Sequence, residues 1–433
     1  MKQGLKSFIS KNPFFKSIIK PCYRFLKPER GIFRFYILRV ADIFIPKKKN
    51  IWIFPVHFYL KTFSDNIRAV YEEVKNDESI IKVILTRDKP IDSFQTDKNT
   101  VILPIKSWKA YWYLLKCKVI FIQHSLRHDF YPIHYKENLI LCLKRRKLVN
   151  LWHGIAVKSI VASSTGIQHR AINKEKKYYY ITASSLNDWM VMVSAFYPVK
   201  PANVIITGSP RNDFVICDES KLPNSNQKQL SELKEKLGGK KLIVYAPTYR
   251  ETNLGGFNYE FSETELNELK QLSRKHNAVI GFRLHYHNRS LNYNKIIDNE
   301  YFIDLDQTLF PDMSVVIRVA EVVISDYSGL IIDTLYANKP IINFTYDYTH
   351  YGLKQRGFSY PLELIAPLPL CHNFQQLTHY LNKALSNDLI EFQEKYKLSQ
   401  KLYFENHDTS NSKRLVEFLK DSLCFKQVKA GNP

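Results

Sequence analysis

The chain has 433 residues, of which 45% are hydrophobic and 14% aromatic, so it is long enough for two or three domains and too apolar to be intrinsically disordered. A formal net charge of +22 favours an anionic partner, such as a phosphate-rich substrate, a membrane surface or a nucleic acid. The six cysteines form no C-x-x-C pair, which argues against a zinc cluster or a disulfide framework. Because we recognise neither a secretory signal nor an apolar stretch of about 20 residues, we expect a cytoplasmic protein.

Residues 1–49 hold half of the net charge, with 13 lysines or arginines and two acidic residues. Aromatic and aliphatic residues recur between the basic ones near helical spacing. This pattern is typical of a basic amphipathic segment that lies in the headgroup layer of an anionic membrane. The alternative is a basic helix that packs on the domain with its charges solvated. Because residues 31–45 include Arg34, Arg39 and Asp42, we do not expect them to span a bilayer.

From residue 50 to about residue 220, short apolar runs alternate with amphipathic stretches. The runs predict strands at 51–54, 80–85, 119–122 and 147–152, and the stretches between them predict helices at 65–74 and 107–115. Residues 201–214 close this half. The polar residues 217–241 predict a linker and a short helix that ends at Gly238-Gly239.

The second half repeats this rhythm. We predict strands at 242–245, 278–284, 301–305, 322–325 and 340–344, and helices at 262–275 and 313–320, the first of which opens on a capping box of Ser262 and Glu265. Near-continuous apolar strands are typical of a parallel sheet covered on both faces.

These elements predict an α/β fold of two facing Rossmann-like domains, at residues 50–220 and 221–390. The basic segment 1–49 precedes them and a helical tail, 391–433, follows. Because ligands bind beyond the carboxyl ends of parallel strands, we expect the functional site in the cleft between the two domains.

The run Ser325-Asp326-Tyr327-Ser328-Gly329 lies between an apolar strand-like stretch and a helix-like stretch. A turn of small residues at this place exposes backbone N–H groups that stabilise a phosphate. The run therefore predicts a phosphorylated ligand, most simply a nucleotide.

Two further clusters follow predicted strands. His153, in Trp152-His153-Gly154, would face the cleft as a general base, and the alternative is a structural histidine bonded to a loop carbonyl. Arg283, His285 and His287 alternate along one face of a strand end and would suit a pyrophosphate. The alternatives there are a solvated edge and a metal-binding histidine pair, for which no third ligand is suggested.

The remaining candidates are weaker. Thr248 and Arg250 end strand 242–245 and could line the cleft, or form a plain loop. Arg211, in the turn 208–213, could reach a phosphate, and we group Asp65 and Asn66 with it on the acceptor side, although Ser64-Asp65-Asn66 alone predicts only a helix N-cap. Asp304-Leu305-Asp306 resembles a metal-binding D-x-D, but we expect a strand end there and predict no metal and no cofactor. The P-loop, G-x-G-x-x-G and G-x-S-x-G motifs are missing from the sequence.

In this order and spacing, the clusters resemble the CDP-glycerol glycerophosphotransferase family of teichoic acid and capsule polymer synthesis, over residues 50 to about 375. The resemblance is carried by L-W-H-G-I at 151–155, G-S-P-R-N-D at 208–213, Y-A-P-T-Y-R at 245–250, R-x-H at 283–285, D-Y-S-G at 326–329 followed by Asp333, T-Y-D at 345–347, R-G-F at 356–358 and A-P at 366–367. The chain departs from the family pattern at Gly329, where serine is common, and at Ile155, where threonine is common. Residues 1–49 carry no family motif.

The resemblance implies a GT-B-like fold and a CDP-glycerol glycerophosphotransferase that works at the cytoplasmic face of the membrane as a peripheral protein. The reaction moves a polyol phosphate, glycerol phosphate first, from a CDP-activated donor to a lipid-linked or glycan acceptor, and CMP leaves. The implied catalytic residues are His153 and His285, and the implied donor-binding residues are Thr248, Arg250, Arg283, Ser325, Asp326, Ser328, Gly329 and Asp333.

Three alternatives remain open. The donor could carry ribitol in place of glycerol, or the protein could be a GT-B glycosyltransferase that uses a nucleotide sugar. From a different class, the charge could belong to a basic protein that binds nucleic acid or a membrane. We predict no nucleic acid partner, because basic residues beyond residue 49 are mixed with acidic ones and no recognition motif is found.

Overall fold

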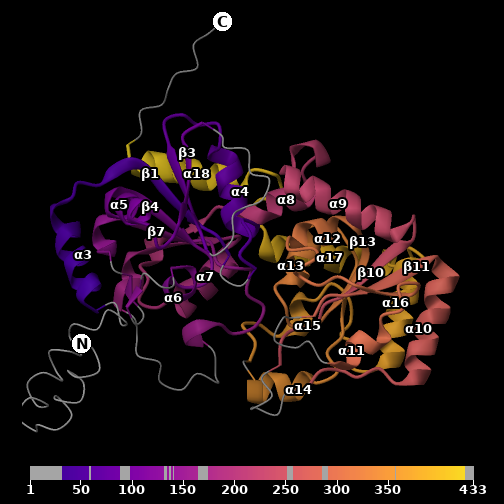
Figure 1. The fold of residues 1–433 in the computed structure, drawn as a ribbon. Coiled ribbons are helices and arrows are strands. Elements are labelled where there is room, and N and C mark those ends of the chain that lie inside the picture. The colour runs from indigo at the N-terminus through magenta and orange to yellow at the C-terminus, as the bar shows by residue number, and fades with distance from the viewer. Residues whose placement is uncertain are drawn as a thin grey trace, which may run out of the picture.

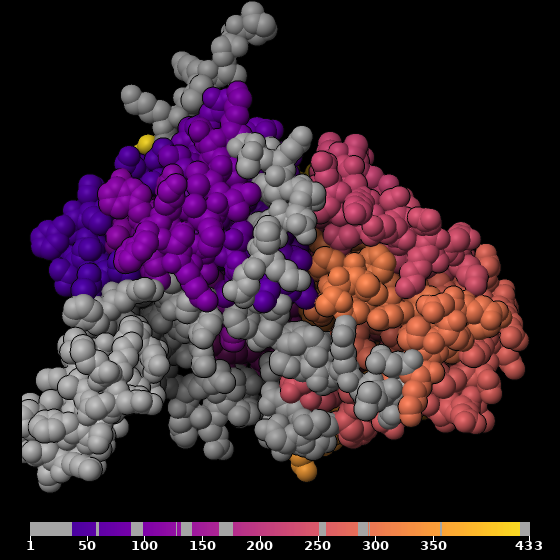
Figure 2. Space-filling model, viewed as in Figure 1, coloured from indigo at the N-terminus to yellow at the C-terminus, as the bar shows by residue number. Residues whose placement is uncertain are grey.

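Two α/β domains lie side by side in the computed structural model (Figure 1). The structure describes residues 32–57, 60–87, 98–130, 134–135, 138–139, 141–163, 174–250, 257–284, 291–355 and 357–424. In Figure 2 the surface of the first domain, indigo to magenta, directly meets that of the second, pink to orange. Together with the structural relatives described below, this confirms the predicted α/β, GT-B-like class.

The first domain is built on a seven-stranded sheet in the order β3-β2-β1-β4-β7-β8-β9. All neighbouring strands are parallel. The strands are β1 (Lys48–Pro55), β2 (Ile81–Thr86), β3 (Thr100–Pro104), β4 (Cys117–Ile122), β7 (Lys147–Asn150), β8 (Tyr179–Ala183) and β9 (Val204–Ile206). The chain steps outward from β1 to β3 and then continues from β4 on the other side, so the switch point lies between β1 and β4.

Helices cover both faces of this sheet because successive strand residues point to opposite faces. Ile53 faces the cluster that contains α5 (Trp108–Lys116) and α7 (Leu186–Ala195). Its neighbours Trp52 and Phe54 face the cluster that contains α4 (Asp65–Val74) and α18 (Asn411–Ser422). Central strands buried on both sides explain the near-continuous apolar runs of the sequence.

The second domain is built on a five-stranded parallel sheet in the order β12-β11-β10-β13-β14. Its strands are β10 (Lys241–Tyr245), β11 (Ala278–Phe282), β12 (Phe302–Asp304), β13 (Ala320–Ser325) and β14 (Ile341–Asn343). Helices α10 (Glu263–His276) and α16 (Phe374–Leu385) cover one face, and α9 (Asn224–Leu237) and α12 (Met313–Val319) cover the other. The switch point lies between β10 and β13, and α13 (Leu330–Tyr336) follows β13.

Local signals in the second domain are confirmed, with one difference in length. The capping box of Ser262 and Glu265 is present, and Gly238 ends α9 in the left-handed region at φ 55°. Helix α9 has 14 residues, longer than the short helix that we predicted, because three of its leucines are buried against the sheet. The strands β3, β8 and β9 and the helix α7 were not predicted, because their apolar runs are short or interrupted by polar residues.

Shorter elements complete the fold. They are α3 (Ile32–Phe44), α6 (Leu126–Asp129), the pair β5 (His134–Tyr135) and β6 (Asn138–Leu139), α8 (Asp213–Ile216), α11 (Leu291–Ile296), α14 (Tyr348–His350), α15 (Leu362–Ile365) and α17 (Gln393–Tyr403). Within the described residues, every helix is too short or too polar to cross a bilayer.

The last helix returns to the first domain. The predicted helical tail contains α17, which packs beside α13 in the second domain, and α18, which packs on α4 (Figure 1, yellow helix beside α4). Backbone N–H groups of Asn411 and Ser412 donate to the Asp213 carboxylate at 2.9 and 2.8 Å, which fixes the start of α18. The apolar face of α18 then completes one half of the first domain's core.

We expect Leu415→Ala to destabilise the protein by about 2–5 kcal/mol, because the side chain is fully buried between α18 and the sheet and its loss leaves a cavity. Glu417→Ala on the exposed face of the same helix is the matched control and should change little. Urea unfolding followed by circular dichroism measures both. Equal losses for the two variants would show that α18 does not belong to the core.

Candidate active site at the domain junction

The loops after β7 and β13 come into close contact where the domains meet. A Cβ added to Gly329, after β13, would lie 2.7 Å from the Ile155 carbonyl oxygen and 3.6 Å from Gly154 Cα. No side chain fits at 2.7 Å, so glycine at 329 is what permits this approach. The contact brings the carboxyl ends of the two sheets together, where ligands of such folds bind.

Three histidine rings and an indole form a row on the first domain's side of this junction. His57 follows β1, His124 follows β4 and His153 follows β7. The ring centroids of His57 and His124 are 4.8 Å apart, and those of His124 and His153 are 5.0 Å apart with planes at 16°. The ring centroids of Trp152 and His153 are 4.2 Å apart. The histidines meet because β1, β4 and β7 are neighbours in the sheet.

His153 has its ring nitrogens in defined roles. Its Nδ1 lies 3.2 Å from the Gln123 carbonyl oxygen. A carbonyl oxygen only accepts, so Nδ1 carries the proton and Nε2 keeps a lone pair. The residue is exposed at the surface, but protein atoms surround the ring, and this desolvation lowers the pKa of His153 well below its ordinary value. The charges of His124, Arg211 and Lys158 lower the pKa further. A neutral imidazole that reaches the protein surface is a suitable proton acceptor.

Asn66 holds the two loops of the first domain together. Its Nδ2 donates to the Trp152 carbonyl at 2.9 Å, while its Oδ1 accepts from Ser209 Oγ at 3.1 Å and from the Arg211 backbone N–H at 2.9 Å. Trp152 has a φ of 53°, which is rare for a residue other than glycine, and the bond from Asn66 stabilises that conformation. All polar atoms of the fully buried Asn66 are therefore used inside the protein, and its predicted contact with a ligand stays a prediction.

Arg211 connects the two domains electrostatically. Its guanidinium pairs with Asp65 at the start of α4 at 3.3 Å and with Asp333 in α13, and it donates to the His153 carbonyl at 3.1 Å. Burial raises the pKa of Asp333 to about 6 although the charge of Arg211 opposes the shift, so this carboxyl is ionised at neutral pH. Three predicted site residues, Arg211, Asp65 and Asp333, thus bind one another across the junction.

Four predicted donor-binding residues form a buried cluster beneath the second domain's loops. Arg250 pairs with Asp326 at 2.7 Å and with Asp347 at 2.8 Å. The backbone N–H and the hydroxyl of Thr248 donate to Asp326 at 2.8 and 2.5 Å, and Ser325 Oγ donates to the Ala246 carbonyl at 2.7 Å. Since these side chains already form hydrogen bonds or ion pairs inside the protein, direct contact between them and a donor stays a prediction.

The turn 328–329 is more open. Ser328 is half-buried, and its Oγ accepts from the Leu330 backbone N–H at 3.3 Å. Helix α13 has only seven residues, and the Gly154–Ile155 segment lies against Gly329 at its start. The phosphate-binding role that we predicted for this turn would therefore depend on Ser328.

Arg283 lies at the end of β11 with its guanidinium buried. One Nη donates to the Leu305 carbonyl at 2.9 Å and to the Phe310 carbonyl at 2.7 Å. Burial lowers the pKa of Arg283 to about 10, and in the part of the chain that the structure describes it has no ion pair. The positive charge is thus retained at neutral pH. His285 lies outside the described residues.

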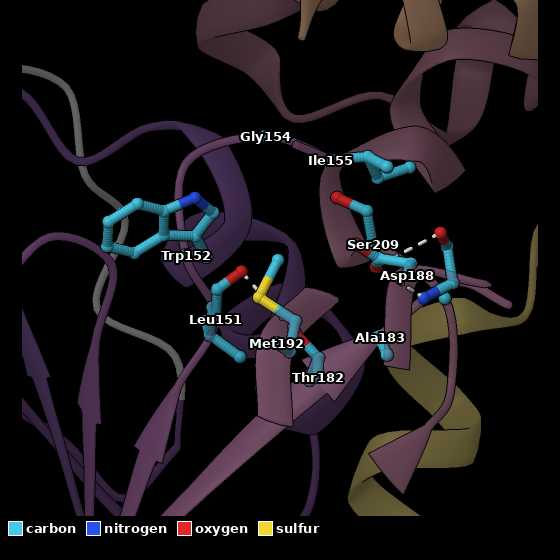
Figure 3. Close-up of a pocket in the computed structure, with 11 residues that line it drawn as sticks. Leu151, Trp152, Gly154, Ile155, Thr182, Ala183, Asp188, Met192 and Ser209 are labelled. Atoms are coloured by element: carbon cyan, nitrogen blue, oxygen red, sulfur yellow. Dashed lines mark hydrogen bonds between the residues drawn. The ribbon is translucent and has the colours of Figure 1, made fainter. Parts of the chain in front are cut away.

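A small recess of about 10 Å³, with room for about one water molecule, adjoins the loop that carries His153 (Figure 3). Trp152 lies on one side of it, and Ile155, Ser209 and Asp188 lie opposite the indole. All the residues that line this recess belong to the first domain, and Trp152 directly precedes His153 in the chain.

The Asp304-Leu305-Asp306 segment has internal partners. Asp304 accepts from the Asp306 backbone N–H at 2.9 Å, and Asp306 accepts from the backbone and hydroxyl of Thr308 at 2.8 and 2.6 Å. These bonds describe the strand end that we expected. Among the described residues, no group of three or more histidine, cysteine or acidic side chains is arranged to hold a metal ion.

Two residues of the histidine row were missed by sequence reasoning. His57 and His124 follow the apolar runs 51–54 and 119–122 as His153 follows 148–151, so the same positional signal was present. They were overlooked because neither lies in a block shared with the family.

Comparison with known proteins identifies the family. The sequence model described as CDP-glycerol:poly(glycerophosphate) glycerophosphotransferase matches residues 37–421. The chain belongs to this family. It is 30% identical over 375 residues to the teichoic acid ribitol-phosphate polymerase TarK of Staphylococcus aureus, covering 82% of this chain and 66% of TarK. It is 25% identical over 405 residues to a teichoic acid poly(glycerol phosphate) polymerase of Bacillus spizizenii, covering 88% and 95% of the two chains.

The length shared with relatives varies. The chain spans 54% of the S. aureus ribitol-phosphate polymerase TarL, to which it is 30% identical over 75% of its own length. Among solved structures, it resembles the wall teichoic acid polymerase TagF, studied in a variant with CDPG, at a TM-score of 0.68 and 20% identity over 89% of this chain and 92% of that one. The structure of S. aureus MnaA with UDP matches at a TM-score of 0.51 and 13% identity, and the match covers 88% of this chain and 97% of MnaA. These likenesses establish the GT-B-like fold.

We expect Arg211→Ala to destabilise the protein by about 3–5 kcal/mol, because it leaves the buried Asp333 and the nearby Asp65 without their cation. Asp333→Asn in the same chain should relieve part of this loss, so the double variant should cost less than the sum of the single ones. Urea unfolding of the four proteins in the cycle measures the coupling. Additive losses would mean that the Arg211–Asp333 pair does not join the domains.

Proposed function

We propose that the protein transfers a polyol phosphate from a CDP-activated donor to a hydroxyl of a lipid-linked or polymeric glycan acceptor, with release of CMP. Membership of the family supports the reaction class. The observation that carries the proposal is His153, whose Nε2 keeps its lone pair on an exposed ring beside the loop that contacts Gly329 of the second domain.

In this proposal the acceptor lies on the first domain and the donor on the second. The acceptor oxygen attacks the phosphorus that bears the polyol, its proton passes to His153 Nε2, and the bond from phosphorus to the CMP oxygen breaks. Transfer of this kind depends mainly on positioning and on stabilising the charge of the non-bridging oxygens.

The two arginines that could bind the donor pyrophosphate differ in whether acidic partners already neutralise their charge. Arg250 is neutralised by Asp326 and Asp347, whereas Arg283 is held by two neutral carbonyls and keeps its positive charge. We therefore propose Arg283 as the main cation for the pyrophosphate. Ser328 and His285 stay further candidates for donor binding. Arg250 then keeps the loops after β10 and β13 in place.

The polyol is proposed as glycerol or ribitol. Sequence analysis favours glycerol, and the B. spizizenii relative is named for poly(glycerol phosphate). Ribitol is the second candidate because both 30% identical relatives are named for ribitol-phosphate. The alternative on the same fold is a glycosyltransferase, which would transfer a sugar from a nucleotide-sugar donor.

We expect the protein to release CMP from either CDP-glycerol or CDP-ribitol, and only when a lipid-linked or glycan acceptor is present.

His153→Ala should lower kcat by about 10²–10⁴-fold and leave donor affinity nearly unchanged, because it removes the base and not the donor site. His276→Ala, on α10 far from the junction, is the matched control. A folded wild-type protein that releases no CMP from either donor would refute the transferase. Loss of donor binding in His153→Ala would make this histidine a binding residue.

Helix α3 and helix α5 present apolar side chains to solvent, which supports the proposed contact with an anionic membrane. Ile37, Val40 and Phe44 share one face of α3, and Trp108 and Trp112 share one face of α5, all more than half exposed. Lys116 lies 3.6 Å from the Trp112 ring. Exposed aromatic and aliphatic residues beside basic ones are typical of a helix that lies in the membrane interface.

The helix α3 is firmly attached to the first domain. Its Asp42 is fully buried and pairs with Arg146 at 2.5 Å and with Lys47 at 2.8 Å. Figure 1 shows α3 on the side of the first domain that faces away from the second, so a membrane at this face would leave the domain junction free.

We expect Phe44→Ser with Trp108→Ser to reduce co-sedimentation with vesicles of anionic lipid, because the pair removes the two most exposed large apolar side chains of the patch. Leu398→Ser, on the exposed face of α17 in the second domain, is the control. CMP release with a soluble acceptor should be unchanged. Equal sedimentation of all three proteins would exclude this patch as the membrane contact.

A further inference from the structure

The turn after β4 is organised by one buried carboxylate. Asp129 Oδ2 accepts from the backbone N–H groups of Gln123 and His124 at 3.0 and 2.9 Å, and its Oδ1 lies 3.2 Å from His124 Nδ1. The Asp129 side chain is 1% exposed. Burial alone would raise its pKa, but these hydrogen bonds outweigh burial and the net pKa is lowered, so the carboxylate is ionised.

The same turn holds His153 through a peptide group. The carbonyl that accepts from His153 Nδ1 belongs to Gln123, and the N–H on the other side of that peptide bond belongs to His124. In a trans peptide the C=O and the N–H point in opposite directions. Asp129, by binding the N–H, therefore aims the C=O at His153. The result is a chain of hydrogen bonds from carboxylate to peptide to imidazole, in which each bond polarises the next.

The ring of His124 supports His153 from the side. The two imidazoles are stacked with centroids 5.0 Å apart and planes at 16°, and Asp129 fixes the orientation of the His124 ring. On its other side, His124 meets the edge of His57, whose pKa burial lowers to about 4, so that ring is neutral. The plane of His153 is thus set by His124 and Trp152 together.

We propose that Asp129 and His124 are positioning residues for His153. Asp129 orients the peptide whose carbonyl fixes the Nδ1–H tautomer, and His124 holds the plane of the ring, so that Nε2 points at the acceptor hydroxyl. This inference rests on the proposed function, in which His153 takes the acceptor's proton. A carboxylate that sets a catalytic histidine's tautomer normally bonds to the ring directly, and here one peptide group lies between them.

The groups around His153 indicate how its titration responds. The cations Arg211 and Lys158 face it and lower its pKa, as does the electrostatic interaction with His124. Around the Asp129 turn, Arg87 donates to the Asp129 backbone carbonyl at 2.8 Å. Replacing His124 by phenylalanine removes the interaction with His124, so the pKa of His153 should rise and the acidic limb of the pH–rate profile should move to higher pH.

The activity test compares Asp129→Asn, His124→Phe and His124→Ala with wild type. We expect Asp129→Asn and His124→Ala to lower kcat by about 10–100-fold, the range typical of residues that orient a catalytic group, with the donor KM unchanged. His124→Phe should lose less than His124→Ala, because it keeps the stacked ring. Asp298→Asn is the matched control. Like Asp129, Asp298 accepts hydrogen bonds from backbone N–H groups, three in its case, but it lies before β12 in the second domain.

A second measurement does not require substrate. With [¹⁵N]histidine-labelled protein, the nitrogen shifts of His153, assigned by comparison with His153→Ala, report which ring nitrogen carries the proton. We expect the Nδ1–H tautomer in wild type and in Asp298→Asn, and a mixture with Nε2–H in Asp129→Asn. If Asp129→Asn does not fold, His124→Phe still tests the inference through the upward shift of the His153 pKa.

The outcomes separate the two proposals. An unchanged tautomer in Asp129→Asn, or an unchanged kcat and pH profile in both His124 variants, overturns the positioning role whether or not the enzyme is active. Wild-type protein that releases no CMP from CDP-glycerol or CDP-ribitol refutes the proposed function, while the nitrogen shifts still decide the positioning of His153.

Discussion

The guanidinium of Arg211 is the interaction on which the geometry of the junction depends. It contacts three separate segments at once: the start of α4 through Asp65, helix α13 through Asp333, and the loop of His153 through a carbonyl. The guanidinium has five donors in a rigid planar fork, so it can satisfy three such partners in one fixed geometry. Each segment would otherwise leave a polar group without a partner away from bulk water, which is costly. One cation therefore fixes the position of His153 relative to the second domain.

The sequence predicted where the candidate site residues lie in the fold better than which of their side chains have partners inside the protein. Apolar runs predicted the central strands to within about three residues, and His153, Arg283 and Ser325 were expected at or just after their carboxyl ends, where they are found. This part succeeds because burial on both faces imposes a continuous apolar pattern. The unpredicted strands β3, β8 and β9 lie toward the edges of the sheet, where that pattern is weaker.

The partners of polar side chains could not be predicted in the same way. Asn66, Arg250 and Asp326 have side chains that could bind a ligand, yet each bonds to residues 76 or more positions away in the sequence. Such pairs depend on how loops from different strands meet, which no local pattern encodes. His124 is the opposite case, since its position after a central strand was visible, and only its contacts with Asp129 and His153 make that position meaningful.

The return of α18 to the first domain has a consequence for the order of folding during synthesis. Domains generally fold from the N-terminus as the chain emerges from the ribosome. Here Trp52 and Phe54 share a buried cluster with Leu415 and Leu419, more than 350 residues later in the sequence. The sheet of the second domain and the helices that cover it, α9, α10, α12 and α16, lie within residues 224–385, so they can be complete before that cluster is closed. The first domain to be translated is thus the last to bury its hydrophobic surface, and until then that surface is open to chaperones and to other nascent chains.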